Sequence, residues 1–170
     1  GTLTSNVICS QCQSRTYSSK ANQMFCTQCP LGKFTRNRLV TTSADFDDAQ
    51  DCVLPPLIKD IIPKNTTTQG NITSSFFGEH FGDSGSVVSI TTNGLVWTDI
   101  VRKNATWIIA KSPPGTGANL KITVEVDGVI SSEHLCLFSY GRPNVTSIIP
   151  PPFNGGTIQI FGKNFGREND

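Results

Sequence analysis

The chain has 170 residues, with 14 basic and 13 acidic side chains and a formal net charge of +1. This balance argues against a basic nucleic-acid-binding arm and against an acidic tail. No apolar run approaches the ~20 residues of a membrane helix, and no signal peptide opens the sequence. The sequence begins at Gly1-Thr2-Leu3 and stops in a polar tail, and we therefore expect a piece of a longer protein. The composition is rich in Ser and Thr (35 together), Gly (15), Asn (12) and Pro (10), which favours short strands joined by turns.

Five of the six cysteines lie in the first 52 residues, which contain few large apolar side chains. Such a segment needs covalent or metal cross-links to hold a fold. Two Cys-x-x-Cys pairs separated by thirteen residues are close to a four-thiolate zinc site. With the fifth cysteine they also suit a disulfide framework in an oxidising compartment. The five are Cys9, Cys12, Cys26, Cys29 and Cys52.

The sequence after the second pair favours disulfides. Residues 29–34 read CPLGKF and resemble the Cys-Pro-x-Gly-x-Phe/Tyr unit of the ephrin-receptor-like, cysteine-rich repeats of extracellular proteins. In that family the two cysteines of each Cys-x-x-Cys belong to different loops. The resemblance therefore implies the disulfides Cys12–Cys26 and Cys29–Cys52, and it leaves Cys9 for a partner upstream of Gly1. It also implies an extracellular location.

A repeat appears after the cysteine-rich segment. Residues 56–63 match residues 143–150 at an offset of 87, and residues 77–82 match residues 161–166 at an offset of 84. An insertion of three residues between two matching blocks is typical of a loop, and the period suits one immunoglobulin-sized sandwich. The repeat thus predicts three parts: a cysteine-rich segment over 1–52, one complete module over 55–141, and the truncated start of a second module over 142–170.

The interior of the complete module predicts strands. Residues 87–92 and 95–97 flank Asn93-Gly94, a strong hairpin signal, and residues 105–110 form another apolar, β-branched run. Apolar and polar residues alternate over 120–126, up to a turn at Asp127-Gly128. No window has a helical period, so the fold class is all-β.

The last strand of this module carries the sixth cysteine. Cys136, Phe138 and Tyr140 alternate with polar residues and therefore share one face. We expect this face to point into the core, with Cys136 buried and unpaired as a small hydrophobic side chain.

These blocks resemble the IPT/TIG domain, an immunoglobulin-like fold shared by plexins, related receptors and Rel-type transcription factors. The family pattern opens with Pro-x-Ile-x-x-Ile, continues with a Gly-x-x-Phe-Gly turn, and ends with Pro-Pro-Gly and Phe-x-Tyr. The matching residues are Pro56, Ile58, Ile61, Gly78, Phe81, Gly82, Pro113, Pro114, Gly115, Phe138 and Tyr140. The resemblance implies an immunoglobulin-like β-sandwich (IPT/TIG) with an N-terminal disulfide-rich loop module.

One short motif is similar to a catalytic one. Residues 82–86, GDSGS, are close to the sequence around the nucleophile of trypsin-like proteases. That chemistry needs a histidine to accept the serine proton and a carboxylate to orient it. His80 is too near Ser84 in the sequence to approach it from a separate wall. We therefore interpret the segment as a turn and expect no catalytic residue.

The other polar clusters predict no metal or cofactor site. The acidic residues between 45 and 51 lack the glycine and the final glutamate of a helix–loop–helix calcium site, and we expect a solvated loop there. Residues 115–117 lack the Gly-Lys-Ser/Thr of a phosphate-binding loop. We expect His134, on the closing strand, to be structural or exposed.

Four Asn-x-Thr sequons lie near predicted turns or strand ends, and they begin at Asn65, Asn71, Asn104 and Asn144. In an extracellular protein most of these asparagines would be accessible for glycosylation.

The predicted joint between the two modules is short. Only residues 141–144 separate the closing strand from the next module, and Pro143 restricts itself and its predecessor to extended conformations. A joint of this kind is not a flexible coil, so we expect the modules to stack end to end.

Three classes of function fit these observations. The first is a non-catalytic fragment of a cell-surface receptor or adhesion protein, similar to plexin-type and Tiger-family ectodomains. It would bind a protein partner, homophilic or heterophilic, or act as a spacer, and it would reach the membrane only through a segment outside this sequence. The second is an accessory module of a secreted enzyme. The third is the dimerisation domain of a Rel-type transcription factor, which would need a basic DNA-contacting domain, whereas the basic residues here form no patch.

Overall fold

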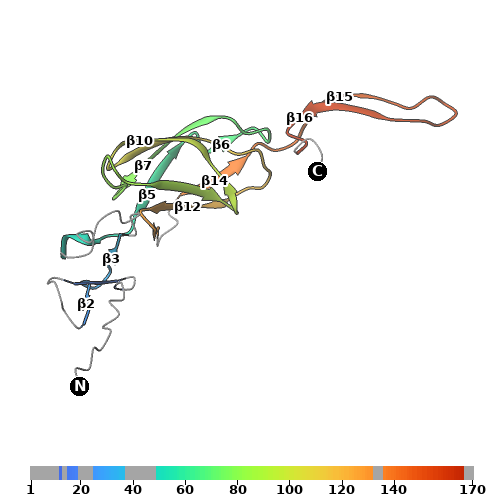
Figure 1. Cartoon of the computed structure of the whole chain (residues 1–170). Coiled ribbons are helices and arrows are strands. Elements are labelled where there is room, and N and C mark those ends of the chain that lie inside the picture. Colours follow the sequence, from blue (N-terminus) through green and yellow to red (C-terminus); the bar gives the residue numbers. More distant parts are fainter. Residues whose placement is uncertain (1–11, 13–14, 19–24, 37–48, 132–135, 167–170) are drawn as a thin grey trace, which may run out of the picture.

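The computed structural model describes residues 12, 15–18, 25–36, 49–131 and 136–166. Apart from one 3-10 turn, Ala49–Asp51 (η1), every regular element in these ranges is a strand, which confirms the all-β prediction. Figure 1 shows a β-sandwich with the cysteine-rich segment at one end and a projecting hairpin at the other. Within the described ranges, no helix is long and apolar enough to cross a membrane.

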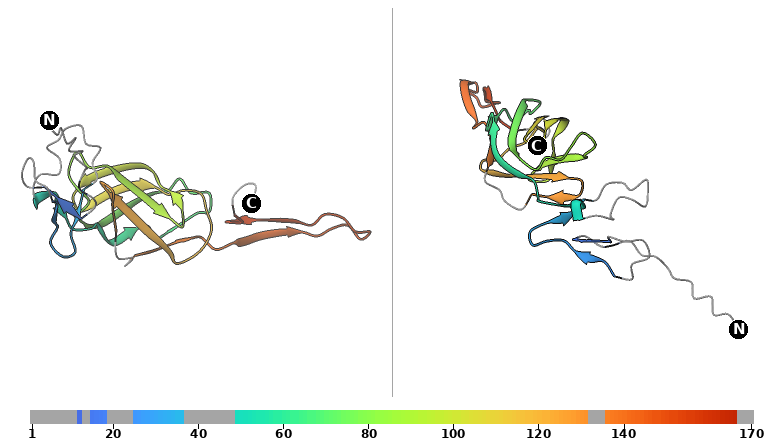
Figure 2. Two further views of the ribbon diagram at one scale, coloured as in Figure 1. Left: turned by 60° about the horizontal axis from the view of Figure 1, so that its bottom comes forward. Right: turned by 90° about the vertical axis from the view of Figure 1, so that its left-hand side faces the viewer.

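The sandwich packs two sheets face to face, and their layering is visible in the two views of Figure 2. The first sheet has the order β10-β11-β7-β5. Its strands are Thr98–Asn104 (β10), Trp107–Lys111 (β11), Thr73–Glu79 (β7) and Leu57–Ile62 (β5). All three pairings in this sheet are antiparallel.

The second sheet has the order β6-β14-β12-β8-β9, and β13 also pairs with β12. Its strands are Asn65–Thr66 (β6), Leu137–Tyr140 (β14), Leu120–Val126 (β12), Val88–Thr92 (β8), Leu95–Val96 (β9) and Val129–Ile130 (β13). The pairing of β6 with β14 is parallel, and the others are antiparallel. Strand β6, near the start of the module, and β14, its last strand, thus run side by side in the same direction.

A cluster of aromatic rings fills the core between the sheets. The ring of Trp97 lies edge-on to those of Phe76 (4.9 Å between centroids) and Phe138 (5.1 Å). Its indole nitrogen donates a hydrogen bond to the Thr92 hydroxyl at 2.7 Å, so the polar atom of this buried side chain is satisfied. Phe138, Tyr140 and Cys136 are all buried, as their alternation predicts.

Both predicted two-residue turns are present. Asn93 and Gly94 have φ values of 49° and 78°, and Asp127 and Gly128 have the same pair of values. Positive φ at both central residues is typical of type I′ hairpins, for which Asn-Gly and Asp-Gly are preferred.

One predicted strand is wrong at its start. Residues 105–110 are expected to be a strand, but β11 begins at Trp107 because Ala105 and Thr106 form the turn that joins β10 to β11. The Asn104 side chain organises this turn, because its Oδ1 accepts hydrogen bonds from the backbone nitrogen and the hydroxyl of Thr106, both at 2.8 Å.

The cysteine-rich segment contains four two-residue strands. They are Thr16–Tyr17 (β1), Thr27–Gln28 (β2), Phe34–Thr35 (β3) and Cys52–Val53 (β4), and they pair as β1–β2 and β3–β4. Disulfides join Cys12 to Cys26 and Cys29 to Cys52, which confirms the pairing that the family resemblance implies. Cys9 lies outside the described residues.

Cys136 is buried and has no disulfide partner among the described residues, as predicted. Its thiol donates a hydrogen bond to the Lys59 carbonyl oxygen at 3.1 Å. Burial raises the pKa of the Cys136 thiol above its ordinary value.

The C-terminal hairpin repeats the first hairpin of the sandwich. It pairs Asn144–Ile149 (β15) with Gln159–Lys163 (β16). At the offsets found in the sequence, every residue pair of β15–β16 corresponds to one of β5–β7, including the register irregularity. The sequence repeat is therefore also a structural repeat.

Candidate functional site at the module junctions

Residues 82–86 form a hydrogen-bonded turn after β7, as predicted. The Asp83 carboxylate accepts a hydrogen bond from the Gly85 backbone nitrogen at 3.0 Å, and Ser86 Oγ accepts one from the Asp83 backbone nitrogen at 3.0 Å. Ser84 and His80 are exposed, and no described hydrogen bond joins them. The two residues are not arranged as a nucleophile and its base in this conformation.

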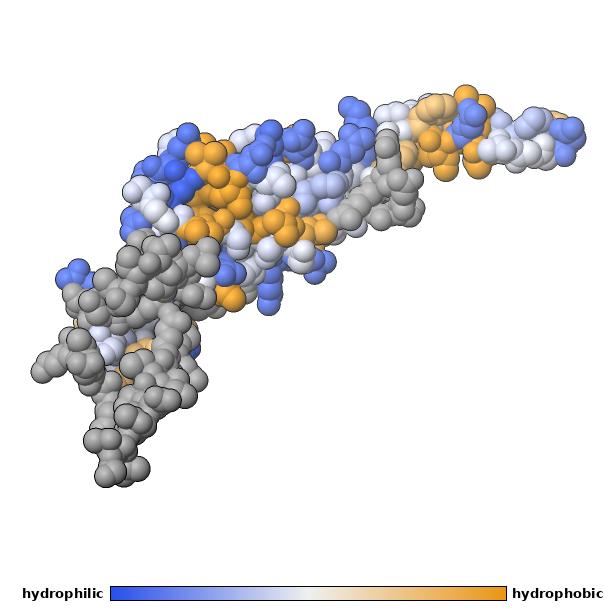
Figure 3. All heavy atoms as spheres, in the orientation of Figure 1, coloured by the Kyte–Doolittle hydropathy of each residue, from blue (hydrophilic) through white to orange (hydrophobic). Residues whose placement is uncertain are grey.

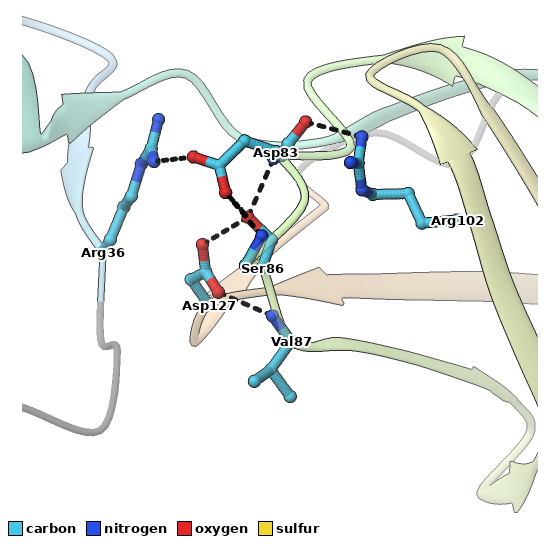
Figure 4. Close-up of polar contacts among 8 residues, drawn as sticks. Arg36, Asp83, Ser86, Val87, Arg102 and Asp127 are labelled. Carbon is cyan, nitrogen blue, oxygen red and sulfur yellow. Dashed lines mark hydrogen bonds and ion pairs between the residues drawn. The ribbon is translucent and has the colours of Figure 1, made fainter.

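A buried carboxylate anchors this turn to the sandwich. Asp127, in the turn between β12 and β13, is 2% exposed and accepts hydrogen bonds from Ser86 Oγ and from the Val87 backbone nitrogen, both at 2.8 Å (Figure 4). On the other side, the Arg102 guanidinium donates to the Gly82 carbonyl oxygen at 3.1 Å. Contacts from the β12–β13 turn and from strand β10 thus fix the position of residues 82–87.

The same turn contacts the cysteine-rich segment. The Arg36 guanidinium, just after β3, forms an ion pair with the Asp83 carboxylate at 3.0 Å, as Figure 4 shows. Arg36 and Asp83 are both partly exposed, so the pair adds little stability but sets an orientation. We name this contact the first junction.

A cleft of about 510 Å³ lies at the first junction, between β3–β4 and the sandwich. Its charged lining is mixed in sign and includes Lys33, Arg36, Glu79, Asp83 and Asp127. Outside the cleft lining, Lys59 hydrogen-bonds to Glu79 and lowers the pKa of that carboxyl. The mixed charges do not define a site for one kind of ion.

A second junction connects the sandwich to the C-terminal hairpin. Only residues 141–143 separate β14 from β15. The Asn164 amide, just after β16, donates to the Arg142 carbonyl oxygen at 3.1 Å and lies within 3.5 Å of the Thr68 backbone nitrogen. A Cβ on Gly141 would lie 2.5 Å from Asn164 Nδ2, so a larger residue there would displace the Asn164 side chain from this contact. One side chain, Asn164, thus contacts both the linker and the end of the sandwich.

The two junctions use equivalent turns. Asn164 corresponds to His80 at the offset of 84 residues, and both have a φ of 61°. His80 and Asp83 line the cleft at the first junction, and Asn164 contacts the linker and the end of the sandwich at the second. In each case the turn after the second strand of a hairpin lies against the part of the chain that precedes it.

All four sequon asparagines are exposed: Asn65, Asn71, Asn104 and Asn144. His134 and the acidic residues 45–48 lie outside the described ranges. Among the described side chains, no group of three or more His, Cys, Asp or Glu residues could hold a metal ion. The Arg36–Asp83 and Asn164–Arg142 contacts have no sequence signal, because each depends on the placement of two separate turns.

The chain consists of an immunoglobulin-like sandwich preceded by a cysteine-rich module. Two family models match it: "IPT/TIG domain" over residues 56–140 and "Tyrosine-protein kinase ephrin type A/B receptor-like" over residues 2–45. The first covers half of the sequence, so the chain belongs to the IPT/TIG family. Modules of both types occur in receptor ectodomains and are typically non-catalytic.

Two solved structures are similar to the chain. The plexin A4 extracellular region is 21% identical, with a TM-score of 0.45, over 63% of this chain and 9% of that chain. A proposed phosphatase from Bacteroides thetaiotaomicron VPI-5482 is 22% identical, with a TM-score of 0.37, over 54% of this chain and 19% of that chain. Neither similarity extends to function, because both identities are low and both TM-scores lie below one half. A comparison with curated proteins gives no significant match.

Proposed function

We propose that the chain is a non-catalytic, extracellular part of a cell-surface receptor or adhesion protein, in which IPT/TIG modules form a stiff spacer that presents protein-binding surfaces. The N-terminal disulfides support an oxidising compartment, where such bonds form and persist. The near-neutral charge supports protein partners rather than nucleic acid.

The observation that carries the spacer role is the pair of junctions. They lie at opposite ends of the sandwich, and at each end a turn contacts the preceding part of the chain through Asp83 or Asn164. Free hinges would leave these side chains in solvent. Contacts on both sides of short linkers restrict bending, which is what a spacer requires.

In this proposal, residues 142–170 begin a second IPT/TIG module. The residues of the hairpin that correspond to buried residues of the sandwich are about half exposed, namely Val145, Ile148, Ile160 and Phe165. In Figure 3 apolar atoms gather on this hairpin. An exposed apolar face of this kind is expected for one sheet of a sandwich whose second sheet is not present to cover it.

Small-angle scattering and residual dipolar couplings on the full chain test the spacer role. We expect an elongated particle in which the cysteine-rich segment and the sandwich tumble as one body. Asp83→Asn removes the ion pair with Arg36, and the residual dipolar couplings of the cysteine-rich segment and of the sandwich should then fit two independent alignment tensors. Asp99→Asn removes the exposed Lys111–Asp99 pair elsewhere and serves as the control. Independent tumbling in the unmodified chain would contradict the proposal.

The extracellular location has a separate test. Expressed behind a secretion leader, the protein should leave the cell with Cys12, Cys26, Cys29 and Cys52 unreactive to a thiol reagent until it is reduced. Reactivity of all four in correctly folded protein, with bound zinc, would support the metal alternative instead.

A further inference from the structure

The outer face of the first sheet carries an apolar patch, which we name the outer patch. It consists of Ile62, Phe77, Val101, Trp107 and Ile109, from all four strands. The register places Val101 opposite Ile109 and Phe77 opposite Trp107, so their side chains lie on one face. Ile62 is 58% exposed and Val101 47%, although a large apolar area open to water is unfavourable.

The centre of the outer patch is a pair of stacked rings. Phe77 and Trp107 have centroids 6.0 Å apart and planes inclined by 18°. The Trp107 indole nitrogen is buried and has no hydrogen-bond partner in the described structure, unlike that of Trp97, so a ligand cannot reach this donor. What the stacked rings offer on this face is an aromatic surface, which suits a ligand that has an apolar face.

A sequon lies directly beside these rings. Asn104 is the cross-strand neighbour of Trp107, and directly opposite residues have side chains on the same face, about 4.5–5.5 Å apart at Cβ. Thr106 holds Asn104 through Oδ1, and no described group accepts a hydrogen bond from Nδ2, which is the atom that carries a glycan. The asparagine is thus exposed, oriented by its own sequon, and adjacent to the outer patch.

The other sequons lack this arrangement. Asn65 pairs with Ser139, Asn144 pairs with Lys163, and Asn71 lies in a loop. Asn104 is therefore the sequon asparagine whose direct cross-strand neighbour is aromatic.

We propose that Asn104 carries an N-linked glycan whose first sugar lies against Trp107 and Phe77 and covers the outer patch. This inference rests on the proposed extracellular function, because the donor is a polyisoprenyl-pyrophosphate oligosaccharide of the secretory pathway. The Asn104 Nδ2–C1 bond forms as the bond from C1 to the pyrophosphate oxygen breaks, and Nδ2 gives up one proton as the polyisoprenyl pyrophosphate leaves. The C–H face of the sugar packs on the negative faces of the rings.

The experiment uses the full chain secreted from eukaryotic cells and labelled with ¹⁵N-tryptophan. Its two tryptophans give two indole N–H resonances, and the buried Trp97 serves as the internal reference. The samples are the glycosylated protein, the same protein trimmed by endoglycosidase H to one sugar per site, and the variants Asn104→Gln and Asn65→Gln. Glycopeptide mass spectrometry measures the occupancy of each site.

We expect Asn104 to be occupied and the Trp107 resonance to shift on Asn104→Gln, to stay unchanged on Asn65→Gln, and to keep its position after trimming. The thermal midpoint should fall by at least about 2 °C on Asn104→Gln, and this difference should vanish in a Trp107→Ala background.

Two results would overturn the inference while leaving the proposed function intact. One is a secreted, disulfide-bonded protein with Asn104 unmodified. The other is a modified Asn104 whose loss leaves the Trp107 resonance in place. A protein that is secreted only with free, zinc-binding thiols would instead contradict the proposed function.

Discussion

His80 and Asn164 lie 84 residues apart and adopt the same left-handed conformation, each with a φ of 61°. The glycines two positions earlier, Gly78 and Gly162, are equally matched, because each leaves no room for a Cβ beside the facing strand. The repeat therefore extends from sequence through register to single backbone angles.

The first prediction concerns Gly78. A Cβ there would lie 2.0 Å from the Leu57 carbonyl oxygen and 2.6 Å from the ring of Phe81, and neither group can move freely in the core. Gly78→Ala should lower the free energy of unfolding by about 3 kcal/mol, as measured by urea denaturation. The control is Gly85→Ala, where the nearest atom is an Asp83 carboxylate oxygen at 3.6 Å. Equal stability of the two variants would show that β5 can shift away from β7.

The second prediction concerns the hydroxyl of Tyr140. This buried group donates a hydrogen bond to the Pro113 carbonyl oxygen at 2.9 Å. Tyr140→Phe leaves that carbonyl unpaired in the core and should cost about 1–2 kcal/mol of stability. The chain has one other tyrosine, Tyr17, in the cysteine-rich segment. The sandwich transition in urea should be unchanged by Tyr17→Phe, and a similar loss in both variants would contradict the assignment.

The third prediction concerns Cys136. Since burial raises its pKa, the folded state favours the neutral thiol. The resulting stability is present below the pKa of the thiol in the unfolded chain, about 8.5, and is lost as the pH rises through the higher folded pKa. The Cys136→Ser variant should have a lower free energy of unfolding than the unmodified protein at pH 7. The difference between the two free energies should become smaller at alkaline pH.

A thiol reagent tests the same burial independently. Cys136 should react slowly in the native protein and rapidly in urea. Fast reaction under native conditions would place the thiol at the surface.

The fourth prediction concerns the disulfide between Cys29 and Cys52, which are 23 residues apart. Replacing both by Ser removes the constraint on the unfolded chain and should destabilise the cysteine-rich segment by about 3 kcal/mol. The sandwich has its own core, so it should keep its backbone resonances and its thermal midpoint within a few degrees. Unfolding of both parts together would show that they form one cooperative unit.

Sequence reasoning succeeded where the signal is local or repeated. Alternation placed Cys136, Phe138 and Tyr140 in the core, and Asn93-Gly94 fixed a turn because few residues tolerate its backbone angles. The disulfide pairs followed from a family resemblance, since spacing alone also fitted zinc.

It failed where structure depends on distant partners. Strand β10 reads TDIVRKN, without clean alternation, because it is an edge strand whose pairing with β11 is interrupted twice. Asp127 was expected in a turn, but its burial against Ser86 depends on a segment 41 residues away. The stack of Phe77 on Trp107 required the register of β7 and β11, which no local pattern encodes.

The parallel pairing of β6 with β14 has a mechanical consequence. The chain enters the sandwich through β5 and β6 and leaves it at the end of β14, and the Thr66 carbonyl oxygen accepts a hydrogen bond from the Gly141 backbone nitrogen at 2.7 Å. Tension along the chain would pull two parallel neighbours in opposite directions, so their hydrogen bonds would be loaded together in shear and not opened one at a time. A second bond, from the Ser139 nitrogen to the Lys64 carbonyl oxygen at 2.9 Å, shares that load. Under single-molecule stretching, the sandwich should therefore rupture in one step, at the pairing of β6 with β14.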